Sequence, residues 1–248
     1  MKLIMLKGVS KSGKTAVAEK IIAGLKARGY TVSSVKDIHS SAYACDEEGT
    51  DTDRHRRSGA NPVTGRGVHD TAVMFNGSLD IDRILDMCGT DYVVLEGDSG
   101  ANCPKIVTGR TPEEADGLID GRTIALSGIM AEHMTEYRGL PVINGLTDAA
   151  ALCDLIEEKT PERMPNFAPG RCSRCGGDCR SLLERVLRGE ASAEDCILRG
   201  RGISVRIDGE ELSMVPFVED IVAGAITGVL KTLKGYRPDA EISIRIKP

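Results

Sequence analysis

The chain has 248 residues, a net charge of −5 and a hydrophobic content of 41%. This apolar content is enough to bury a core, which excludes a disordered chain, and no apolar run reaches the length of a membrane span. The negative charge and the aromatic content of only 3% argue against a nucleic-acid-binding protein. The first residues run directly into a motif, without a cleavable apolar segment, so we expect a cytoplasmic protein.

The first two thirds of the chain alternate between strand patterns and helix patterns. In chain order, the apolar spacing predicts a strand at 2–7, a helix at 15–28, a strand at 31–35, a helix at 81–88, strands at 91–95, 122–127 and 140–144, and a helix at 149–158. This alternation predicts an α/β fold with a mainly parallel sheet. Between the second strand and the next helix, residues 45–73 form a polar, charge-dense loop that we expect to be functional.

The composition changes near Thr160, and this change divides the chain into four predicted parts. Residues 1–160 form a nucleotide-binding domain, and residues 161–171, with three prolines, form a linker. Residues 172–200 contain a four-cysteine cluster. Residues 201–248 are predicted to form an α+β module with a hairpin around Asp208-Gly209-Glu210, an amphipathic helix over 217–234 and a strand over 241–247.

A phosphate-binding motif follows the first strand. Residues 8–15 fit the pattern G-x-x-x-x-G-K-[ST] between a predicted strand and a predicted helix, which is the context that a P-loop requires. The lysine supplies a charge to the β- and γ-phosphates, and the threonine hydroxyl can bind magnesium. The predicted nucleotide-binding residues are Gly8, Ser10, Lys11, Ser12, Gly13, Lys14 and Thr15. The domain is therefore expected to be a P-loop NTPase.

The magnesium site needs a carboxylate near Thr15. Glu96 ends the strand at 91–95, and Asp37 follows the strand at 31–35, so both lie where the carboxyl ends of parallel strands meet. Both stay candidates for the metal. Lys11 either reaches a second nucleotide across a dimer interface or is a solvated loop lysine.

The choice of base stays open at this stage. The guanine-reading sequence N-K-x-D is absent, and Asn144-Gly145-Leu146-Thr147-Asp148 is one residue too long and lacks the lysine. The sequence therefore does not separate guanine from adenine.

Several segments occur together in one order: the P-loop, Val35–His39, Asp53–Ala60, Val93–Gly97, Lys105–Val107 and Ile124–Ser127. In this respect the chain, over about residues 1–158, resembles the molybdopterin-guanine dinucleotide biosynthesis adaptor protein B family. The resemblance implies a P-loop protein that binds GTP and Mg²⁺, forms a homodimer, hydrolyses GTP slowly and assists attachment of GMP to molybdopterin. The implied partners are a nucleotidyltransferase and the enzymes that use the molybdenum or tungsten cofactor.

The resemblance also assigns roles to residues of this chain. Lys14 and Glu96 would act in the slow hydrolysis, and His39, Arg54, His55 and Arg57 would face the nucleotide or the pterin cofactor. Paired arginines suit bidentate phosphate binding, although the same arginines also fit a solvated helix face. Ser40 and Ser41 stand where the family usually has more histidine.

Four of the eight cysteines lie within the pattern Cys172-x2-Cys175-x3-Cys179-x16-Cys196. Four thiolates at such spacing can hold one metal centre. The segment resembles the small iron–sulfur domain of Rnf-type electron-transport subunits and corrinoid iron–sulfur proteins, which has x4 where this chain has x3. The resemblance implies a [4Fe–4S] cluster, and a closed tetrahedral Zn²⁺ site is the alternative.

Three functions fit these features. The first is a GTP-binding adapter in molybdenum or tungsten cofactor maturation, and this is the function we expect. The second is an ATP-dependent factor that assembles or inserts a metallocofactor or an iron–sulfur cluster. The third is a P-loop kinase or ligase that acts on a small molecule, with cysteines that are only structural.

Overall fold

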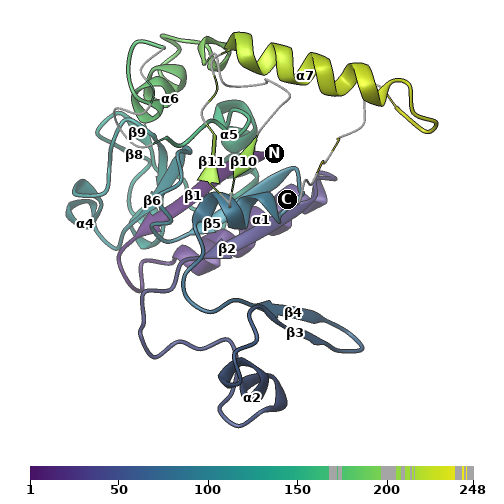
Figure 1. The fold of residues 1–248 in the computed structure, drawn as a ribbon. Helices are drawn as coiled ribbons and strands as arrows, with labels where there is room; N and C mark the ends of the chain where they lie inside the picture. The colour runs from purple at the N-terminus through teal and green to yellow at the C-terminus, as the bar shows by residue number, and fades with distance from the viewer. Residues whose placement is uncertain are drawn as a thin grey trace.

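The computed structural model describes residues 1–167, 172, 175–196, 205–207, 210–212, 214, 216–237, 242 and 244. A parallel sheet forms its centre (Figure 1). The sheet contains β1 (Lys2–Gly8), β2 (Val32–Lys36), β5 (Tyr92–Glu96), β6 (Lys105–Thr108) and β7 (Thr123–Ser127) in the order β2-β5-β1-β6-β7. All neighbouring pairs are parallel, so the predicted α/β fold is confirmed.

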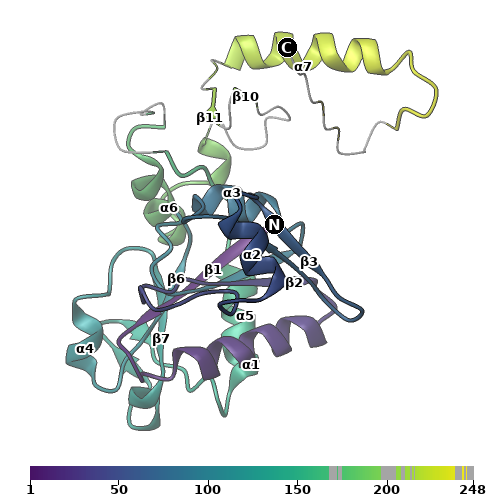
Figure 2. The ribbon, with the colours of Figure 1, turned by 60° about the horizontal axis from the view of Figure 1, so that its bottom comes forward.

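Helices cover both faces of this sheet, which explains why its central strands are almost continuously apolar. On one face, α1 (Lys14–Ala27) packs beside α5 (Ala149–Lys159) in a core that includes Ile4, Ile21 and Leu152. On the other face, α3 (Ile81–Asp86) inserts Leu85 against the opposite side of β1 and β5. Figure 2 shows α1 and α5 below the sheet and α3 above it.

A third apolar cluster lies at the β7 end of the sheet. There α4 (Pro112–Asp116) and the short 3-10 helix η1 (Ile129–Glu132) contribute Ala115 and Met130 to the core. The strand expected over 140–144 is wrong in its extent. Leu140–Pro141 forms β9, which pairs with β8 (Glu136–Tyr137), and Val142 makes only a single bridge to Leu126. Proline has no N–H to donate, so Pro141 limits strand pairing here.

The region expected to be a polar loop contains regular structure. It holds α2 (Asp51–Arg57) and a hairpin of β3 (Val63–Arg66) and β4 (Thr71–Met74), which extend away from the sheet as one arm (Figure 1). Thr50 caps α2 by accepting a hydrogen bond from the Asp53 N–H at 3.2 Å. The helix has seven residues and each hairpin strand has four. Such short elements contain few apolar residues, so the sequence shows no clear hydrophobic periodicity here.

Beyond α5 the chain stays against the domain. Glu162 binds the amino group of Met1 at 2.6 Å, and Arg163 pairs with Asp82 and Asp86 of α3. Then α6 (Cys179–Leu187) packs Leu187 against the core that contains Ile21. The segment that begins the predicted linker therefore lies against the domain that contains the parallel sheet.

The last part of the chain is described in pieces. The strand β10 (Arg206–Ile207) pairs antiparallel with β11 (Glu210–Glu211), where a hairpin is expected, but Asp208 and Gly209 of the expected turn lie outside the described residues. A 3-10 helix, η2 (Ala193–Asp195), precedes them in the chain. The amphipathic helix forms α7 (Pro216–Leu230). The predicted strand over 241–247 lies outside the described residues except for Ile242 and Ile244. Among the helices that the structure describes, none is both long and apolar enough to cross a bilayer.

Candidate functional site

The P-loop connects the end of β1 to the start of α1. Gly13 has φ +92° and occupies the N-cap position of α1, and Lys11 also has a positive φ of 60°. Glycine adopts the left-handed conformation without steric cost, which lets the chain turn sharply into the helix. The first N–H groups of α1 have no partner within the helix, so this end can bind an anion.

The P-loop packs against the end of β6 and the segment that follows β7. The buried Ser12 hydroxyl lies 2.7 Å from the Thr108 hydroxyl at the end of β6. A Cβ at Gly8 would lie 2.2 Å from the Thr108 carbonyl oxygen, and a Cβ at Gly128 would lie 2.3 Å from the Ser12 carbonyl oxygen. These two glycines are therefore required for the close approach of the loop to β6 and to the segment after β7.

Lys14 folds back over the loop. Its Nζ donates hydrogen bonds to the carbonyl oxygens of Gly8 at 2.8 Å and Val9 at 2.5 Å. Burial, together with the positive charge of Lys36, outweighs the effect of Glu96 and lowers the pKa of Lys14. A phosphate oxygen near Nζ would stabilise the charged ammonium, as expected for a lysine that binds the β- and γ-phosphates.

The carboxylate at the end of β5 lies next to the first turn of α1. The Thr15 hydroxyl donates a hydrogen bond to Glu96 Oε1 at 2.7 Å, and Lys36 Nζ lies 3.1 Å from the same oxygen. Asp37 is adjacent because its N–H donates to the Glu96 carbonyl at 2.8 Å, and a Cβ at Gly97 would lie 2.8 Å from Asp37 Cβ. The structure thus brings together the three predicted magnesium-binding residues.

A cavity of about 590 Å³ opens above the loop, which is within the usual size range of small-molecule sites. His39 lies at its edge, 3.4 Å from Asp37, so this predicted site residue faces the cavity. The cavity is lined by Lys7, Gly8, Ser10, Lys11, Gly13, Lys14, Thr15, Ala16, Lys36, Asp37, His39, Glu96, Gly97, Asp98 and Leu118.

Several of these lining residues were not predicted from the sequence, among them Lys7, Lys36, Asp98 and Leu118. Lys7 pairs with Asp98 at 2.6 Å, Lys36 contacts Glu96, and Leu118 comes from the loop after α4. Position at a strand end is the signal that could have identified the three charged residues, since Lys7, Lys36 and Asp98 lie at or just after the carboxyl ends of adjacent parallel strands. Leu118 has no such signal, because only the tertiary fold places its loop beside the P-loop.

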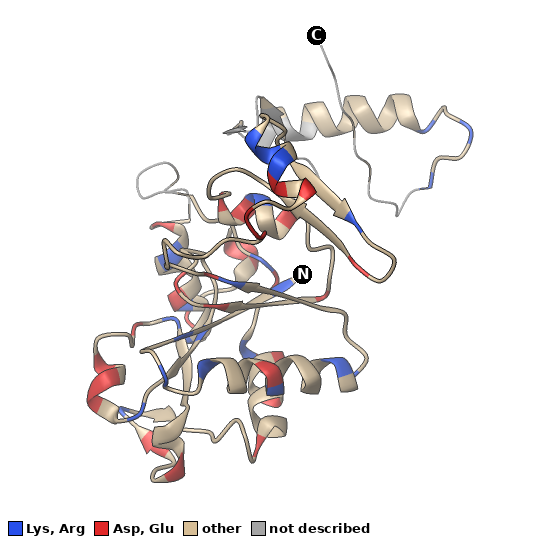
Figure 3. Ribbon diagram, turned by 90° about the horizontal axis from the view of Figure 1, so that it is seen from below, with Lys and Arg blue, Asp and Glu red and all other residues tan. Residues whose placement is uncertain are grey.

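The predicted cluster of Arg54, His55 and Arg57 does not line this cavity. These residues lie on α2 in the arm, and this helix contains both acidic and basic residues (red and blue ribbon in Figure 3). Arg57 pairs with Asp53 at 2.9 Å and with Glu48 at 2.8 Å, and Arg56 also pairs with Asp53. The structure therefore does not bring this cluster to the nucleotide cavity together with His39, because the arm extends away from the sheet, and a contact of the cluster with the pterin cofactor stays a prediction.

The segment considered for base recognition makes local contacts. The Asn144 side-chain oxygen accepts hydrogen bonds from the Leu146 and Thr147 N–H groups, and Asp148 caps α5 by accepting from the Ala151 N–H at 3.2 Å. Both side chains thus serve turn and helix-cap roles, and they give no preference for guanine.

Of the four cysteines of the predicted metal site, Cys179 begins α6 and Cys196 directly follows η2. Cys179 and Cys196 are buried, whereas Cys172 and Cys175 are half-buried. Burial raises the pKa of the Cys179 thiol, and the other three thiols are close enough to raise it further. Among the described residues, however, no group of three or more His, Cys, Asp or Glu side chains is arranged as a metal site.

Comparison with known proteins identifies the family. The model of the MobB family, molybdopterin guanine dinucleotide synthesis protein B, matches residues 3–128, about half of the chain. A relative from Methanocaldococcus jannaschii, named as a molybdopterin-guanine dinucleotide biosynthesis adapter protein, is 30% identical over 99% of this chain and 97% of its own length. A Bacillus subtilis relative with the corresponding name is 29% identical over 57% of this chain and 84% of its own length.

The fold agrees with this match. The crystal structure of Bacillus subtilis MobB aligns with a TM-score of 0.54 and 26% identity, and the alignment covers 66% of this chain and all of that structure. The Methanocaldococcus relative matches along nearly the whole chain, so the residues beyond α5 are common to both proteins. The chain belongs to the MobB family of molybdopterin-guanine dinucleotide synthesis proteins.

Proposed function

We propose that this chain is an adapter that binds GTP with Mg²⁺ during the synthesis of the molybdopterin guanine dinucleotide cofactor. The observation that carries the proposal is the joint placement of Lys14, Thr15 and Glu96 around one cavity at the end of the parallel sheet. The donors suit a nucleotide phosphate with its metal: an ammonium, a hydroxyl, a carboxylate and the free N–H groups of a helix. The proposed phosphate-binding residues are those of the loop from Gly8 to Thr15.

Hydrolysis at this site is proposed to be slow. Lys14 would stabilise negative charge on the β- and γ-phosphates, and Thr15 with Glu96 or Asp37 would hold the metal. Glu96 already accepts a hydrogen bond from Thr15 and forms an ion pair with Lys36, so it is poorly placed to take a proton from an attacking water. This arrangement favours a binding and positioning protein over an efficient NTPase.

The proposed partners are those of the pathway in which the relatives are named: the pterin cofactor, a nucleotidyltransferase and the enzymes that receive the cofactor. A homodimer and a cytoplasmic location belong to the same proposal. The arm supports a role in contacting anionic groups, because Asp53 holds Arg56 and Arg57 side by side while both guanidinium groups stay partly exposed. Arg54 and His55 lie on the same short helix.

We also propose that Cys172, Cys175, Cys179 and Cys196 hold a metal centre, either a [4Fe–4S] cluster or Zn²⁺. Their close spacing in the sequence supports a shared ligand set, and four thiolates suit both centres. Metal, iron and sulfide analysis of protein purified without oxygen would distinguish the two. The division into a nucleotide domain (1–160), a four-cysteine part (172–200) and a C-terminal module (201–248) remains part of this proposal.

The nucleotide site is tested by the substitution Lys14→Ala. The Kd for GTP in excess Mg²⁺ should rise about 100-fold, equivalent to about 2.7 kcal/mol, because the variant loses the charge at the phosphates. Lys20→Ala removes a lysine from the exposed face of the same helix and should leave the Kd within about twofold. Equal affinity of the Lys14 variant and the native protein would show that the loop does not bind the phosphates.

An ATP-dependent cofactor-assembly or insertion factor remains the second candidate. The Asn144 and Asp148 side chains are engaged in a turn and a helix cap, so no described contact selects guanine over adenine. A preference for ATP is therefore compatible with this site.

A further inference from the structure

The ends of β2 and β5 place a lysine beside the proposed metal ligands. Lys36 and Glu96 are register partners in these two parallel strands, and each is the last residue of its strand. Lys36 Nζ lies 3.1 Å from Glu96 Oε1 and 3.4 Å from Thr15 Oγ1, and the Thr15 hydroxyl donates to the same Glu96 oxygen at 2.7 Å. The sheet register therefore positions the ammonium against the hydroxyl and the carboxylate that are expected to bind magnesium.

The oxygen atoms at this point of the cavity suit a magnesium ion. Mg²⁺ is usually held by one or two carboxylates together with the phosphates of its nucleotide, rather than by a full set of protein ligands. Thr15 and Glu96 supply two oxygens, and Asp37, the residue after Lys36, lines the same cavity. When bound there, the ion would supply positive charge to the β- and γ-phosphates. Lys36 thus contacts the oxygens that this ion would need.

An ammonium group and a divalent cation compete for such a position. A metal bound to Thr15 Oγ1 and Glu96 Oε1 would lie next to Lys36 Nζ, and two positive charges at this separation repel each other. The Lys36 side chain is 54% exposed and has a flexible stem, whereas the Glu96 side chain is only 13% exposed. Exchange of the two cations therefore requires movement of the lysine and not of the carboxylate.

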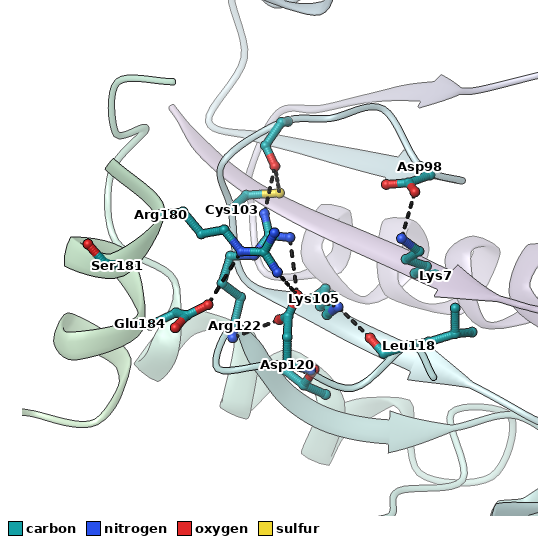
Figure 4. A network of polar contacts seen from close by, with 12 residues as sticks. Lys7, Asp98, Cys103, Lys105, Leu118, Asp120, Arg122, Arg180, Ser181 and Glu184 are labelled. Carbon is teal, nitrogen blue, oxygen red and sulfur yellow. Dashed lines mark hydrogen bonds and ion pairs between the residues drawn. The ribbon is translucent and has the colours of Figure 1, made fainter. Parts of the chain in front are cut away.

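The lysine near the end of β1 has a different partner. Lys7 lines the same cavity but pairs with Asp98 at 2.6 Å, and this carboxylate is not one of the proposed metal ligands (Figure 4). Removal of the Lys7 charge would therefore leave Lys36 in contact with Thr15 and Glu96. The two lysines provide a matched comparison, since each contributes one positive charge to the cavity and only Lys36 contacts the expected ligands of the metal.

We propose that Lys36 is a substitute cation: its ammonium takes the position of the divalent metal at Thr15 and Glu96, and the metal has to displace it. This role rests on the proposed function, because it assumes that nucleotide phosphates bind beside Thr15. The nucleotide-free protein binds a divalent metal weakly, since Lys36 already neutralises Glu96. A nucleotide binds even when metal is absent, since Lys36 then supplies positive charge to its phosphates.

The first measurement is the Kd for Mn²⁺, used as the probe, in the full chain without nucleotide, by electron paramagnetic resonance of the unbound ion. Lys36→Met removes the ammonium and keeps an unbranched side chain. It should bind Mn²⁺ about fivefold more tightly or more than the native protein, because the charge that repels the metal is gone. Addition of Glu96→Gln to this variant should abolish the gain. The control Lys7→Met should change the Kd by less than about twofold, because solvent and salt screen a charge that does not contact the metal position.

The second measurement compares the Kd for GDP in EDTA with the Kd for GDP in excess Mg²⁺, by calorimetry. The ratio of the two values should be about fivefold larger or more in Lys36→Met than in the native protein, because the variant has no charge that replaces the metal at the phosphates. Far-ultraviolet circular dichroism should show that all the variants are folded.

Equal Mn²⁺ affinities of Lys36→Met and the native protein would overturn the competition and leave the proposed function standing. An equal gain in Lys7→Met would also overturn it, because the effect would then come from the total charge of the cavity. Failure of the native protein to bind GDP in excess Mg²⁺ would instead overturn the proposed nucleotide site, and with it the role of Lys36 toward phosphate. The Mn²⁺ comparison needs no nucleotide, so the two failures are distinguishable.

Discussion

The carboxylate of Asp120 is the partner of a buried lysine, Lys105. It pairs with Lys105, Arg122 and Arg180, and the Lys105 side chain is only 3% exposed. Burial alone would raise the pKa of Asp120, but the hydrogen bond and charge of Lys105, together with Arg122, lower it to about 2. Burial likewise lowers the pKa of Lys105, and Asp120 opposes this effect. Each group therefore depends on the other for its charge inside the protein.

Asp120→Asn should lower the free energy of unfolding by roughly 3 kcal/mol at pH 7, because it leaves the Lys105 ammonium buried without its partner. The carboxyl has a lower pKa in the folded state than its usual value of 3.8, so its stabilisation is present above that value. The difference between native protein and variant should shrink as the pH falls from about 4 to about 2. Urea unfolding followed by circular dichroism measures this, since the chain has no tryptophan.

Asp154→Asn provides the comparison, because Asp154 pairs with Arg28 on the surface and its side chain is 71% exposed. Its effect should stay below about 0.5 kcal/mol at either pH. A similar loss from both substitutions would contradict the special role of the buried pair.

At the scale of elements, the P-loop packs against the end of β6 and the segment after β7. Gly128 follows β7 with φ +86°, and a side chain there would strike the Ser12 carbonyl. Gly29 ends α1 with a similar φ of +92°, but a Cβ there would have no atom within 4 Å. Both glycines thus have a positive φ, but only Gly128 is closely surrounded by other atoms.

Gly128→Ala should therefore weaken nucleotide binding more than Gly29→Ala. Both substitutions place alanine at a positive φ, which costs about 1–3 kcal/mol, and Gly128, with a ψ of −156°, lies in a region that only glycine commonly adopts. Only Gly128→Ala also displaces Ser12, so it should weaken GTP binding about tenfold or more, whereas Gly29→Ala should leave the Kd unchanged. Thermal unfolding and nucleotide titration of the two variants would check this, and equal nucleotide affinities would mean that the P-loop does not depend on its contact with the β7 end.

The elements differ in how well the sequence predicts them. The strands β1, β5 and β7 are continuous apolar runs, and α1 and α5 are long enough to show helical periodicity, so they could be predicted. The arm could not, since α2 has seven residues and its hairpin strands have four each, almost all polar or exposed. The P-loop, Glu96 and Asp37 were predictable because a motif and the strand-end rule locate them.

The placement of Arg54, His55 and Arg57 was not predictable, because charge alone does not indicate which way an arm extends. Leu118 and the Asp120 pairs likewise depend on loops that come together only in three dimensions. At this scale a resemblance located the nucleotide end of the sheet, but the contacts between distant segments came only from the structure.

At the scale of the whole molecule, the central claim is that this protein uses a guanine nucleotide bound at the P-loop end of its sheet. The most direct test is to measure the affinities of the native full-length protein for GTP and ATP side by side, in excess Mg²⁺, by calorimetry. We predict tighter binding of GTP by about tenfold or more, equivalent to about 1.4 kcal/mol. Tighter binding of ATP would contradict the proposal and favour an ATP-dependent cofactor-assembly factor.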